Sequence, residues 1–306
     1  MFFWETGTNM TQRFRHYAWS DCPDGVRRQV LAFVAGVTKV LGTNLIGVYL
    51  HGSLASGCFN PRTSDIDLLV VTPRRVGRLK RGLAALALAT SSKPCPIEVT
   101  SFSAKDLDPW RYPTPFDFHF SEDWRAAYES GSALRRMGRK GEDPAAQITE
   151  ARARGVALVG GPIKKVLPVV PRGDFLDSIL SDLRWALRKL KGNPVMEGRV
   201  RVGTYLVLNA CRVLAFLETG RVLSKVEGGD WALRRVPTKH AAVIRSARRA
   251  FGRSSEHGGL ETAGVRSFAT WAAGRINSLN GSKRSEINAG KLSVRRRMSV
   301  MVRLER

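Results

Sequence analysis

The sequence predicts an α/β (α+β) protein with a mixed-sheet N-terminal domain and a C-terminal α-helical bundle. Short apolar runs rich in β-branched residues and bounded by turn residues occur early, at Leu45–Leu50, Ile66–Thr72 and Ile97–Phe102. Such runs are typical of buried strands. Beyond Pro168 and Pro171 the apolar spacing is helical throughout, with turns that contain glycine, as in antiparallel bundles.

Helical periodicity also separates the early strands. Apolar residues recur at helical spacing within 24–41, 74–90 and 143–157 of the first half. In the second half the same spacing predicts helices over 175–190, 204–218, 227–236 and 241–251, and a further one near 265–276. Alternating strands and helices followed by helices alone predict two domains.

Composition limits the compartment and the partners. Of 306 residues, 43% are hydrophobic, no apolar stretch reaches the roughly 20 residues of a membrane helix, and the N-terminus lacks a signal-peptide pattern. We therefore expect a cytoplasmic, monomeric protein without a membrane partner. Four scattered cysteines without metal-ligand spacing indicate reduced, inert thiols: Cys22, Cys58, Cys95 and Cys211.

The charge is unusually basic. Fifty Lys and Arg against 26 Asp and Glu give a net charge of +24, a balance often found in proteins that bind polyanions. The alternative is that the excess arginines are spread over solvent-exposed faces, which would give the same net charge without a polyanionic partner. Eight basic residues and two acids lie between Lys283 and Arg306, so the tail accounts for part of the excess.

Two short motifs frame a candidate site. Gly52-Ser53 ends the first predicted strand, and Asp65-Ile66-Asp67 opens the second. Strand alternation places both aspartates on one face, where a divalent cation would relieve their repulsion and bind substrate phosphates as well. A glycine lets the backbone approach a phosphate, and the serine hydroxyl can hold its oxygens. A surface Asp pair beside an ordinary turn is the alternative.

This arrangement of strand, Gly-Ser, loop and Asp-x-Asp resembles the DNA polymerase beta-like nucleotidyltransferases. Glu98 lies on the strand that follows the helix after the aspartates. A lone glutamate on a strand is usually exposed to solvent. The resemblance instead implies that this strand supplies a third carboxylate to the metal site.

Further segments are similar to one family, the bacterial aminoglycoside (3'')(9) adenylyltransferases, over roughly residues 45 to 250. The segments are HGSLASG with SDIDLLVV, the strand with Glu98, PWRYP, GVALVGGP, NACRVLAFLETG and GRVLSKVEGGDWAL. Only the first pair is general to the superfamily. The PWRYP loop and the SKVEGGDW helix are narrower signals. On this basis we expect an N-terminal arm (1–20), a nucleotidyltransferase domain (21–167), a helical domain that closes over ATP and substrate (168–255), and a basic tail (256–306) whose order the pattern leaves open.

The resemblance implies site residues one by one. Asp65 and Asp67, with Glu98, would bind two Mg²⁺ ions that hold the triphosphate of ATP, and Glu98 would act as general base on the drug hydroxyl. The residues implied to contact ATP are Gly52, Ser53, Ser64, Arg212 and Lys225. The residues expected to contact the aminoglycoside are Trp110, Asp117 and Glu197.

Two departures from the family pattern bear on the acceptor. Where the streptomycin-modifying enzymes have an acid ahead of the arginine-bearing helix, this chain has Val202 or Gly203, and Glu197 is the nearest acid upstream. A net charge of +24 would also repel a cationic drug at long range. Because charges are screened over about 8 Å at physiological ionic strength, local acids can still dominate. The candidate local acids are Asp117, Glu122, Asp123, Glu197 and Asp230.

The sequence therefore predicts an ATP- and Mg²⁺-dependent adenylyltransferase that transfers AMP to a hydroxyl of an aminoglycoside or aminocyclitol of the streptomycin or spectinomycin type. Two alternatives stay open. The acceptor is RNA or protein in the first, which the basic charge motivates. In the second, the chain binds nucleic acid through its basic tail without catalysis, and the Asp pair is structural. Nucleic acid is the less favoured partner in both.

Overall fold

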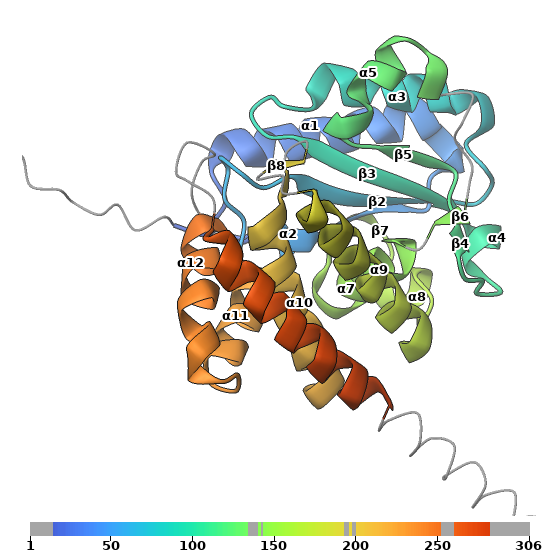
Figure 1. The fold of residues 1–306 in the computed structure, drawn as a ribbon. Coiled ribbons are helices and arrows are strands. Elements are labelled where there is room, and N and C mark those ends of the chain that lie inside the picture. Colours follow the sequence, from blue (N-terminus) through green and yellow to red (C-terminus); the bar gives the residue numbers. More distant parts are fainter. Residues whose placement is uncertain are drawn as a thin grey trace, which may run out of the picture.

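The first half of the chain is built on one five-stranded mixed sheet (Figure 1). The computed structural model describes residues 15–133, 140–141, 143–192, 196–197, 200–251 and 260–281. The strand order is β5-β3-β2-β1-β7, in which β2 and β3 run parallel and the other neighbours antiparallel. The strands are β1 (Gly47–His51), β2 (Ile66–Thr72), β3 (Ile97–Ser103), β5 (Phe118–Phe120) and β7 (Val156–Gly160). The predicted mixed sheet is confirmed.

Strand register brings three polar residues to one end of the sheet. In the parallel pair Asp67 lies opposite Glu98, and in the antiparallel pair Asp67 lies opposite His51. The carboxyl end of β1 therefore meets the amino ends of β2 and β3. Because neighbouring strands lie about 4.8 Å apart, side chains in register on the same face are forced close together.

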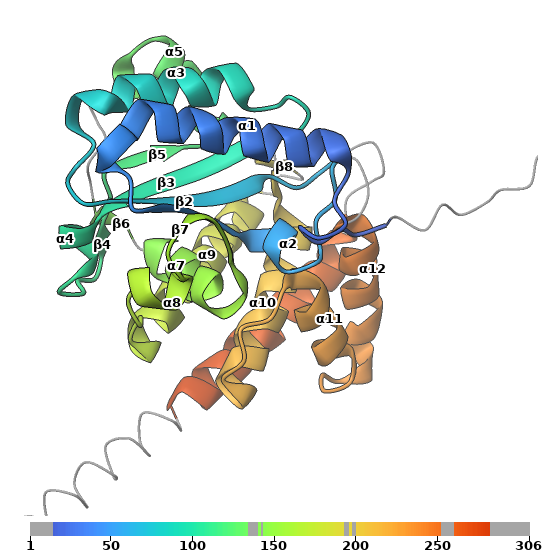
Figure 2. The ribbon, with the colours of Figure 1, turned by 180° about the vertical axis from the view of Figure 1, so that it is seen from behind.

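Helices cover both faces of the sheet. One face packs against α1 (Asp24–Leu41), α3 (Lys80–Thr90) and α5 (Arg125–Glu129), as the rear view shows (Figure 2). Val30, Phe33 and Val37 of α1 are buried there at helical spacing. The other face packs against α4 (Ala104–Leu107), α7 (Asp143–Arg154) and α8 (Ile163–Val166). The short elements are α2 (Gly52–Ala55), η1 (Gly42–Asn44), η2 (Gly77–Leu79), η3 (Glu122–Trp124), β4 (Thr114–Pro115) and β6 (Lys140–Gly141).

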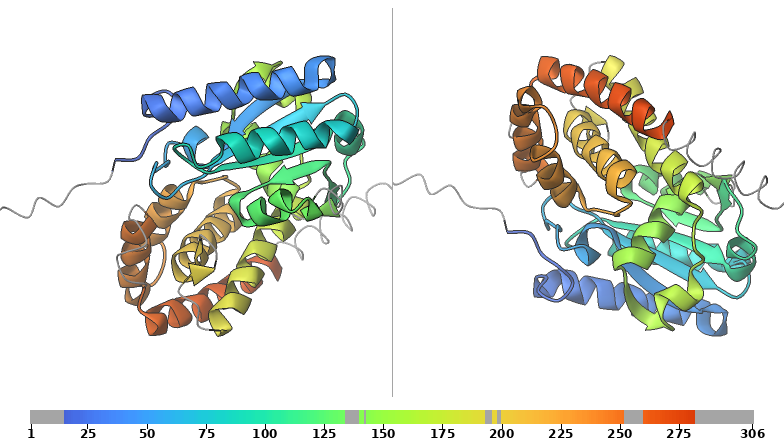
Figure 3. Two further views of the ribbon diagram at one scale, coloured as in Figure 1. Left: turned by 90° about the horizontal axis from the view of Figure 1, so that it is seen from above. Right: turned by 90° about the horizontal axis from the view of Figure 1, so that it is seen from below.

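The second half is helical. It contains α9 (Arg172–Lys191), α10 (Val202–Thr219), α11 (Lys225–Leu233), α12 (Ala241–Phe251) and a last helix over 262–281, besides β8 (Met196–Glu197), β9 (Val200–Arg201) and η4 (Thr238–His240). The helix α10 lies in the middle of the group (Figure 3). Within the described chain it is the one helix long and apolar enough to cross a membrane, yet 72% of it is buried against its neighbours. Its apolar surface packs in the core of the helical domain.

The start of α11 is fixed by local hydrogen bonds. The Ser224 side chain accepts a hydrogen bond from the Glu227 N–H (3.2 Å), and the Glu227 carboxylate accepts one from the Ser224 N–H (2.8 Å). This capping box satisfies two backbone donors at the helix start. Glu227 also binds Arg154 of α7 through two contacts of 2.7 and 2.8 Å. The helix is thereby attached to the nucleotidyltransferase domain, with Lys225 as its first residue.

The helix predicted near 265–276 is present beyond the expected domain limit at residue 255. The helix over 262–281 buries Val265, Phe268, Ala272 and Ile276 in the same core as α9 and α10. These four positions follow helical spacing, but glycine- and serine-rich sequence before them hid their continuity with the domain. At the other end, Tyr17 of the predicted arm pairs with Phe59 through a β-bridge. Residues 1–14 and 282–306, the rest of the arm and tail, lie outside the described residues.

Truncating Phe268 should show that the last helix is part of the domain core. Phe268→Ala removes a fully buried ring, and we expect the free energy of unfolding to fall by about 3–5 kcal/mol. Urea denaturation followed by circular dichroism measures it. Asn277→Ala, on the exposed side of the same helix, is the matched control, and equal losses in both variants would place the helix outside the core.

Candidate active site

A cleft of about 750 Å³ lies where the polar end of the sheet faces the helical domain. Its walls come from the β1–α2 turn, the starts of β2 and β3, and helices α7, α9, α10 and α11. The cleft brings together eight residues that the sequence singled out: Gly52, Ser53, Ser64, Asp65, Asp67, Glu98, Arg212 and Lys225. Residues from both domains therefore line one site.

The carboxylates at the sheet end are crowded. Burial, then the neighbouring charges of Glu98 and Asp65, raise the pKa of Asp67 well above its usual range. Burial, then Asp65 and Asp143, raise the pKa of Glu98 to about 8. The Gln147 side-chain amide donates a hydrogen bond to Glu98 Oε1 (3.2 Å). Raised pKa values of this kind mark a place where extra positive charge is strongly favourable.

This donor set suits Mg²⁺ together with phosphate oxygens. Within the described part of the chain, no three His, Cys, Asp or Glu side chains are close enough to form a complete metal site. The predicted set of Asp65, Asp67 and Glu98 is thus brought to one cleft, but not into a preformed cage. Mg²⁺ commonly uses one or two carboxylates and completes its shell with water and substrate phosphates. Adjacent carboxylates with raised pKa values fit that pattern.

Gly52 is required by the position of Asp67. Its φ angle is +63°, in the left-handed region that favours glycine, and a Cβ atom would lie 1.8 Å from Asp67 Oδ2. The Asp67 carboxylate therefore occupies the space above the turn. Beside it, the Ser53 hydroxyl is buried without a hydrogen-bond partner among the described residues. Ser64 Oγ accepts a hydrogen bond from the Asn60 N–H (3.1 Å).

Arg212 of α10 is held by an ion pair across the domain boundary. Its guanidinium contacts Glu150 of α7, donates to the Leu223 carbonyl (2.8 Å) and donates to Asn209 Oδ1 (3.1 Å). Burial alone would lower the pKa of Arg212, but the Glu150 charge outweighs it and raises that pKa. Burial conversely opposes ionisation of Glu150, while the charge and hydrogen bond of Arg212 keep its pKa below the usual range. Both groups are charged in this arrangement.

Lys225 faces the carboxylates from the start of α11. Its Nζ atom lies 5.0 Å from the ring centroid of Tyr205 and 5.6 Å from that of Phe251, close enough for cation–π contacts. Its charge lowers the pKa values of Asp67 and Glu98 and partly offsets their repulsion. The Lys225 ammonium is positioned to balance the carboxylates or a bound phosphate.

The structure does not bring two predicted drug contacts to the cleft. The Trp110 indole N–H donates to Asp174 of α9 (2.7 Å), and its ring packs on the core beneath α7 and α8. Asp117 is 1% exposed, accepts a hydrogen bond from the Val76 N–H and pairs with Lys80 (3.5 Å). In this arrangement Trp110 links the two domains and Asp117 is held by Val76 and Lys80. Their contact with the drug stays a prediction.

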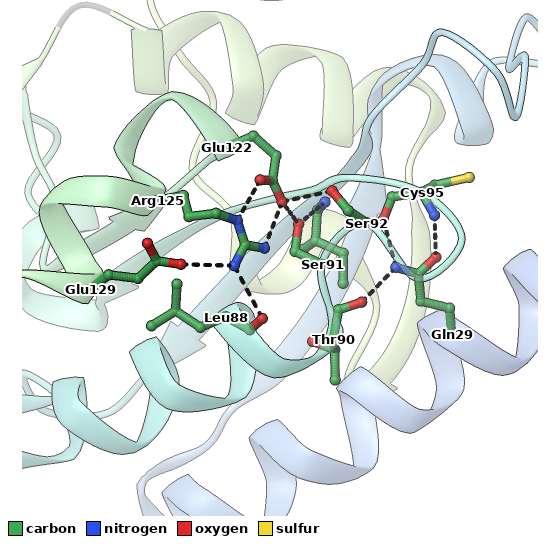
Figure 4. A network of polar contacts seen from close by, with 10 residues as sticks. Gln29, Leu88, Thr90, Ser91, Ser92, Cys95, Glu122, Arg125 and Glu129 are labelled. Carbon is green, nitrogen blue, oxygen red and sulfur yellow. Dashed lines mark hydrogen bonds and ion pairs between the residues drawn. The ribbon is translucent and has the colours of Figure 1, made fainter.

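Other expected acids also lie elsewhere. Glu122 belongs to a network with Arg125, Ser91 and Ser92 near the end of α3 (Figure 4). Arg125, with the two serines, lowers the pKa of Glu122 to about 2 despite partial burial. Asp230 forms an ion pair with Arg248 (2.6 Å). Glu197 lies in β8, but its side chain is outside the described set, so its contact with the substrate stays a prediction.

Several cleft residues were missed by sequence reasoning. They are His51, Asp143, Gln147, Glu150, Asp182 and Asn209. His51 is buried, which lowers its pKa to about 4 and keeps the imidazole neutral. The others lie on helices α7, α9 and α10. A polar residue on the apolar side of an amphipathic helix was the available signal for Asn209, which interrupts the apolar run of α10.

Comparison with known proteins assigns the family. Residues 165–274 match the model of the aminoglycoside adenylyltransferase C-terminal domain, and residues 37–109 match that of the nucleotidyltransferase domain. An Escherichia coli aminoglycoside (3'') (9) adenylyltransferase is 30% identical over 264 residues, which cover 84% of this chain and 97% of that relative. This chain belongs to the aminoglycoside adenylyltransferase family. It is accordingly an enzyme of the nucleotidyltransferase class.

Two more similar proteins extend the comparison. A Staphylococcus aureus spectinomycin 9-adenylyltransferase is 27% identical over 235 residues, 74% of this chain and 85% of that relative. The crystal structure of spectinomycin adenyltransferase AAD(9) from Enterococcus faecialis, with ATP and spectinomycin, superposes with a TM-score of 0.68. It is 22% identical and covers 82% of this chain and 99% of that one. The adenylyltransferase fold is thus shared along most of the chain.

Adding a methyl group at Gly52 should disrupt the nucleotide site. In Gly52→Ala the new Cβ displaces the Asp67 carboxylate, and we expect Mg²⁺-dependent ATP binding to weaken at least about 10-fold in isothermal titration calorimetry, because a carboxylate ligand moves. Gly57→Ala is the matched control, since φ at Gly57 is +74° but the nearest atom to its Cβ is Ala18 Cβ at 3.9 Å. Equal weakening in both variants would assign the effect to backbone strain.

Removing the charge of Glu98 should stabilise the metal-free enzyme at high pH. The folded-state pKa is about 8, against an ordinary value of 4.5, so wild-type stability is lost as the pH rises between these values. One pKa unit corresponds to about 1.4 kcal/mol, so Glu98→Gln should gain a few kcal/mol over wild type at pH 8 and little at pH 5. Urea denaturation in EDTA measures the difference. If the difference in unfolding free energy between Glu98→Gln and wild type does not change with pH, the assigned burial of this carboxyl is contradicted.

Proposed function

We propose that this adenylyltransferase transfers AMP from ATP to a hydroxyl of an aminoglycoside or aminocyclitol of the streptomycin or spectinomycin type and releases pyrophosphate. The observation that carries the proposal is the register of Asp67 opposite Glu98, facing Arg212 and Lys225 across the cleft. The names of the relatives agree with this acceptor class. We also propose that the enzyme acts as a monomer, because both sides of the cleft come from one chain.

The sheet end and α11 would bind the triphosphate. Gly52 and Ser53 form a turn that a phosphate can approach closely, and the buried Ser53 hydroxyl lacks a partner among the described residues. Asp65 and Asp67 would hold two Mg²⁺ ions, whose charge offsets that of the carboxylates and the phosphates. Lys225 and Arg212 would stabilise the charge that develops on the leaving pyrophosphate.

Glu98 would act as the general base. In the reaction the acceptor oxygen bonds to the α-phosphorus, the bond from that phosphorus to the bridging oxygen breaks, and the acceptor proton passes to Glu98. A sugar hydroxyl is a weak acid, so a base within hydrogen-bond reach lowers the barrier. Burial and neighbouring carboxylates raise the pKa of Glu98 in the metal-free protein, and bound Mg²⁺ would favour the ionised form that accepts the proton.

Local charge supports a cationic acceptor despite the basic chain. Among the described residues, six Asp and Glu side chains line the cleft, against four Lys and Arg side chains. Three of these acids, Asp65, Asp67 and Glu98, would be engaged with Mg²⁺, and Glu150 is paired with Arg212. The remaining acids, Asp143 and Asp182, would face a bound aminoglycoside within the screening length of about 8 Å.

A pyrophosphate-release assay tests the proposal. Purified enzyme with ATP and Mg²⁺ is offered spectinomycin, streptomycin or tRNA, and we expect release with at least one aminocyclitol drug and none with tRNA. Release that depends on tRNA and ignores both drugs would instead select the RNA acceptor. No release with any of them would refute the proposal.

Asp67→Asn should lower turnover at least about 1,000-fold without unfolding the protein, because it removes a carboxylate from the metal and triphosphate site. Glu98→Ala should lower kcat by about 100- to 10,000-fold, the usual contribution of a general base, and leave the Kd of ATP within a few-fold. Glu218→Gln, which removes a charge outside the cleft, is the control. Equal losses of kcat and ATP affinity in Glu98→Ala would contradict its assignment as base.

A further inference from the structure

The helical wall of the cleft carries a polar pair that the chemistry above does not use. Asp182 comes from α9 and Asn209 from α10. Both line the large cleft, and both also line a small cavity behind it. Both residues therefore belong to the helical side of the cleft, while Asp67 and Glu98 belong to the sheet end.

Asn209 presents a hydrogen-bond donor that has no partner in the described structure. The residue is 5% exposed, and its Oδ1 atom accepts a hydrogen bond from Arg212 (3.1 Å). Its Nδ2 atom is buried and unpaired among the described residues. A buried donor without a partner is costly, and a ligand oxygen in the cleft would accept its hydrogen bond.

Asp182 adds a carboxylate to the same wall. The Tyr205 hydroxyl donates a hydrogen bond to it, while burial and the nearby charge of Asp143 raise its pKa to about 6. Asp143 and Asp182 also raise the pKa of Glu98, so the three carboxyls share one negative region of the cleft. A positively charged ligand group is the partner that this region favours.

The helix that carries Asp182 is held against the nucleotidyltransferase domain. The Trp110 indole donates to Asp174 (2.7 Å), and the Tyr112 hydroxyl donates to Asp177 (2.9 Å). Both acceptors lie on α9, in the two turns before Asp182. The PWRYP loop thus fixes the distance between Asp182 and the sheet end, which is what a binding wall for a defined ligand requires.

We infer that Asp182 and Asn209 form the amine-binding subsite for the acceptor, in which Asp182 binds a protonated amine and Asn209 Nδ2 donates to a neighbouring hydroxyl or ether oxygen. This inference rests on the proposed function. A carboxylate and an amide donor together match the alternating amines and oxygens of an aminocyclitol. The triphosphate is an unsuitable partner for Asp182, because both groups are negative.

Steady-state kinetics with spectinomycin and ATP test the inference. Asp182→Asn should raise the KM for spectinomycin at least about 10-fold and change kcat and the KM for ATP less than about 2-fold. Asp182→Glu, which keeps the charge, should recover part of the affinity. Asn209→Ala is a second variant in case Asp182→Asn does not fold, and it should also raise the KM for the drug. Glu218→Gln removes an acid outside the cleft and should change none of these values.

An acceptor whose amines are acetylated separates the amine contact from a structural effect. Wild-type enzyme should bind it as weakly as Asp182→Asn binds spectinomycin, and Asp182→Asn should show no further loss, since the two changes remove the same contact. A normal KM for spectinomycin in a folded Asp182→Asn, or a rise in the KM for ATP instead, overturns the inference and leaves the proposed function standing. No pyrophosphate release by wild type with any drug overturns both.

Discussion

The placement of Asp67 beside Glu98 is the constraint on which the rest of the site depends. Parallel pairing of β2 and β3 fixes the two carboxylates in register. Burial, together with the charges of neighbouring carboxylates, raises the pKa of both. A glycine is needed at position 52 because Asp67 fills the space above it. The positive charge that balances these carboxylates comes from outside the sheet. Lys225 of α11 supplies part of it, and the carboxylates that it does not balance suit Mg²⁺.

Polar contacts between charged or hydrogen-bonding side chains join the two domains around the cleft. Arg154 binds Glu227 beneath α11, and Arg212 binds Glu150 beside the cleft. The Trp110 hydrogen bond to Asp174 closes the far side. An Arg–carboxylate pair that is partly buried is costly to break because it leaves one charge unpaired. These contacts tie the two domains together on opposite sides of the cleft.

Sequence reasoning located the sheet end because alternation and strand order are local properties. The spacing of Asp65 and Asp67 fixed their common face, and the resemblance to the polymerase beta-like nucleotidyltransferases identified Glu98. Sequence reasoning did not show that Trp110 and Asp117 lie away from the cleft, because a loop and a strand end can face either the cleft or the core, and only packing decides. Residues on α7, α9 and α10 were missed for the same reason, because helix periodicity does not reveal which neighbour a polar face meets.

Net charge and local charge point to opposite partners in this enzyme, and the local arrangement is the better guide. The chain carries +24, yet among the described residues more Asp and Glu than Lys and Arg side chains line the cleft. Long-range repulsion of a cationic drug slows its approach and is screened by salt, whereas contacts inside the cleft act at distances where screening is weak. Acceptor affinity should therefore depend on the few acids that face the bound drug, while the surface excess of arginine affects mainly the rate of encounter. A basic composition is compatible with a cationic substrate whenever the site itself is acidic.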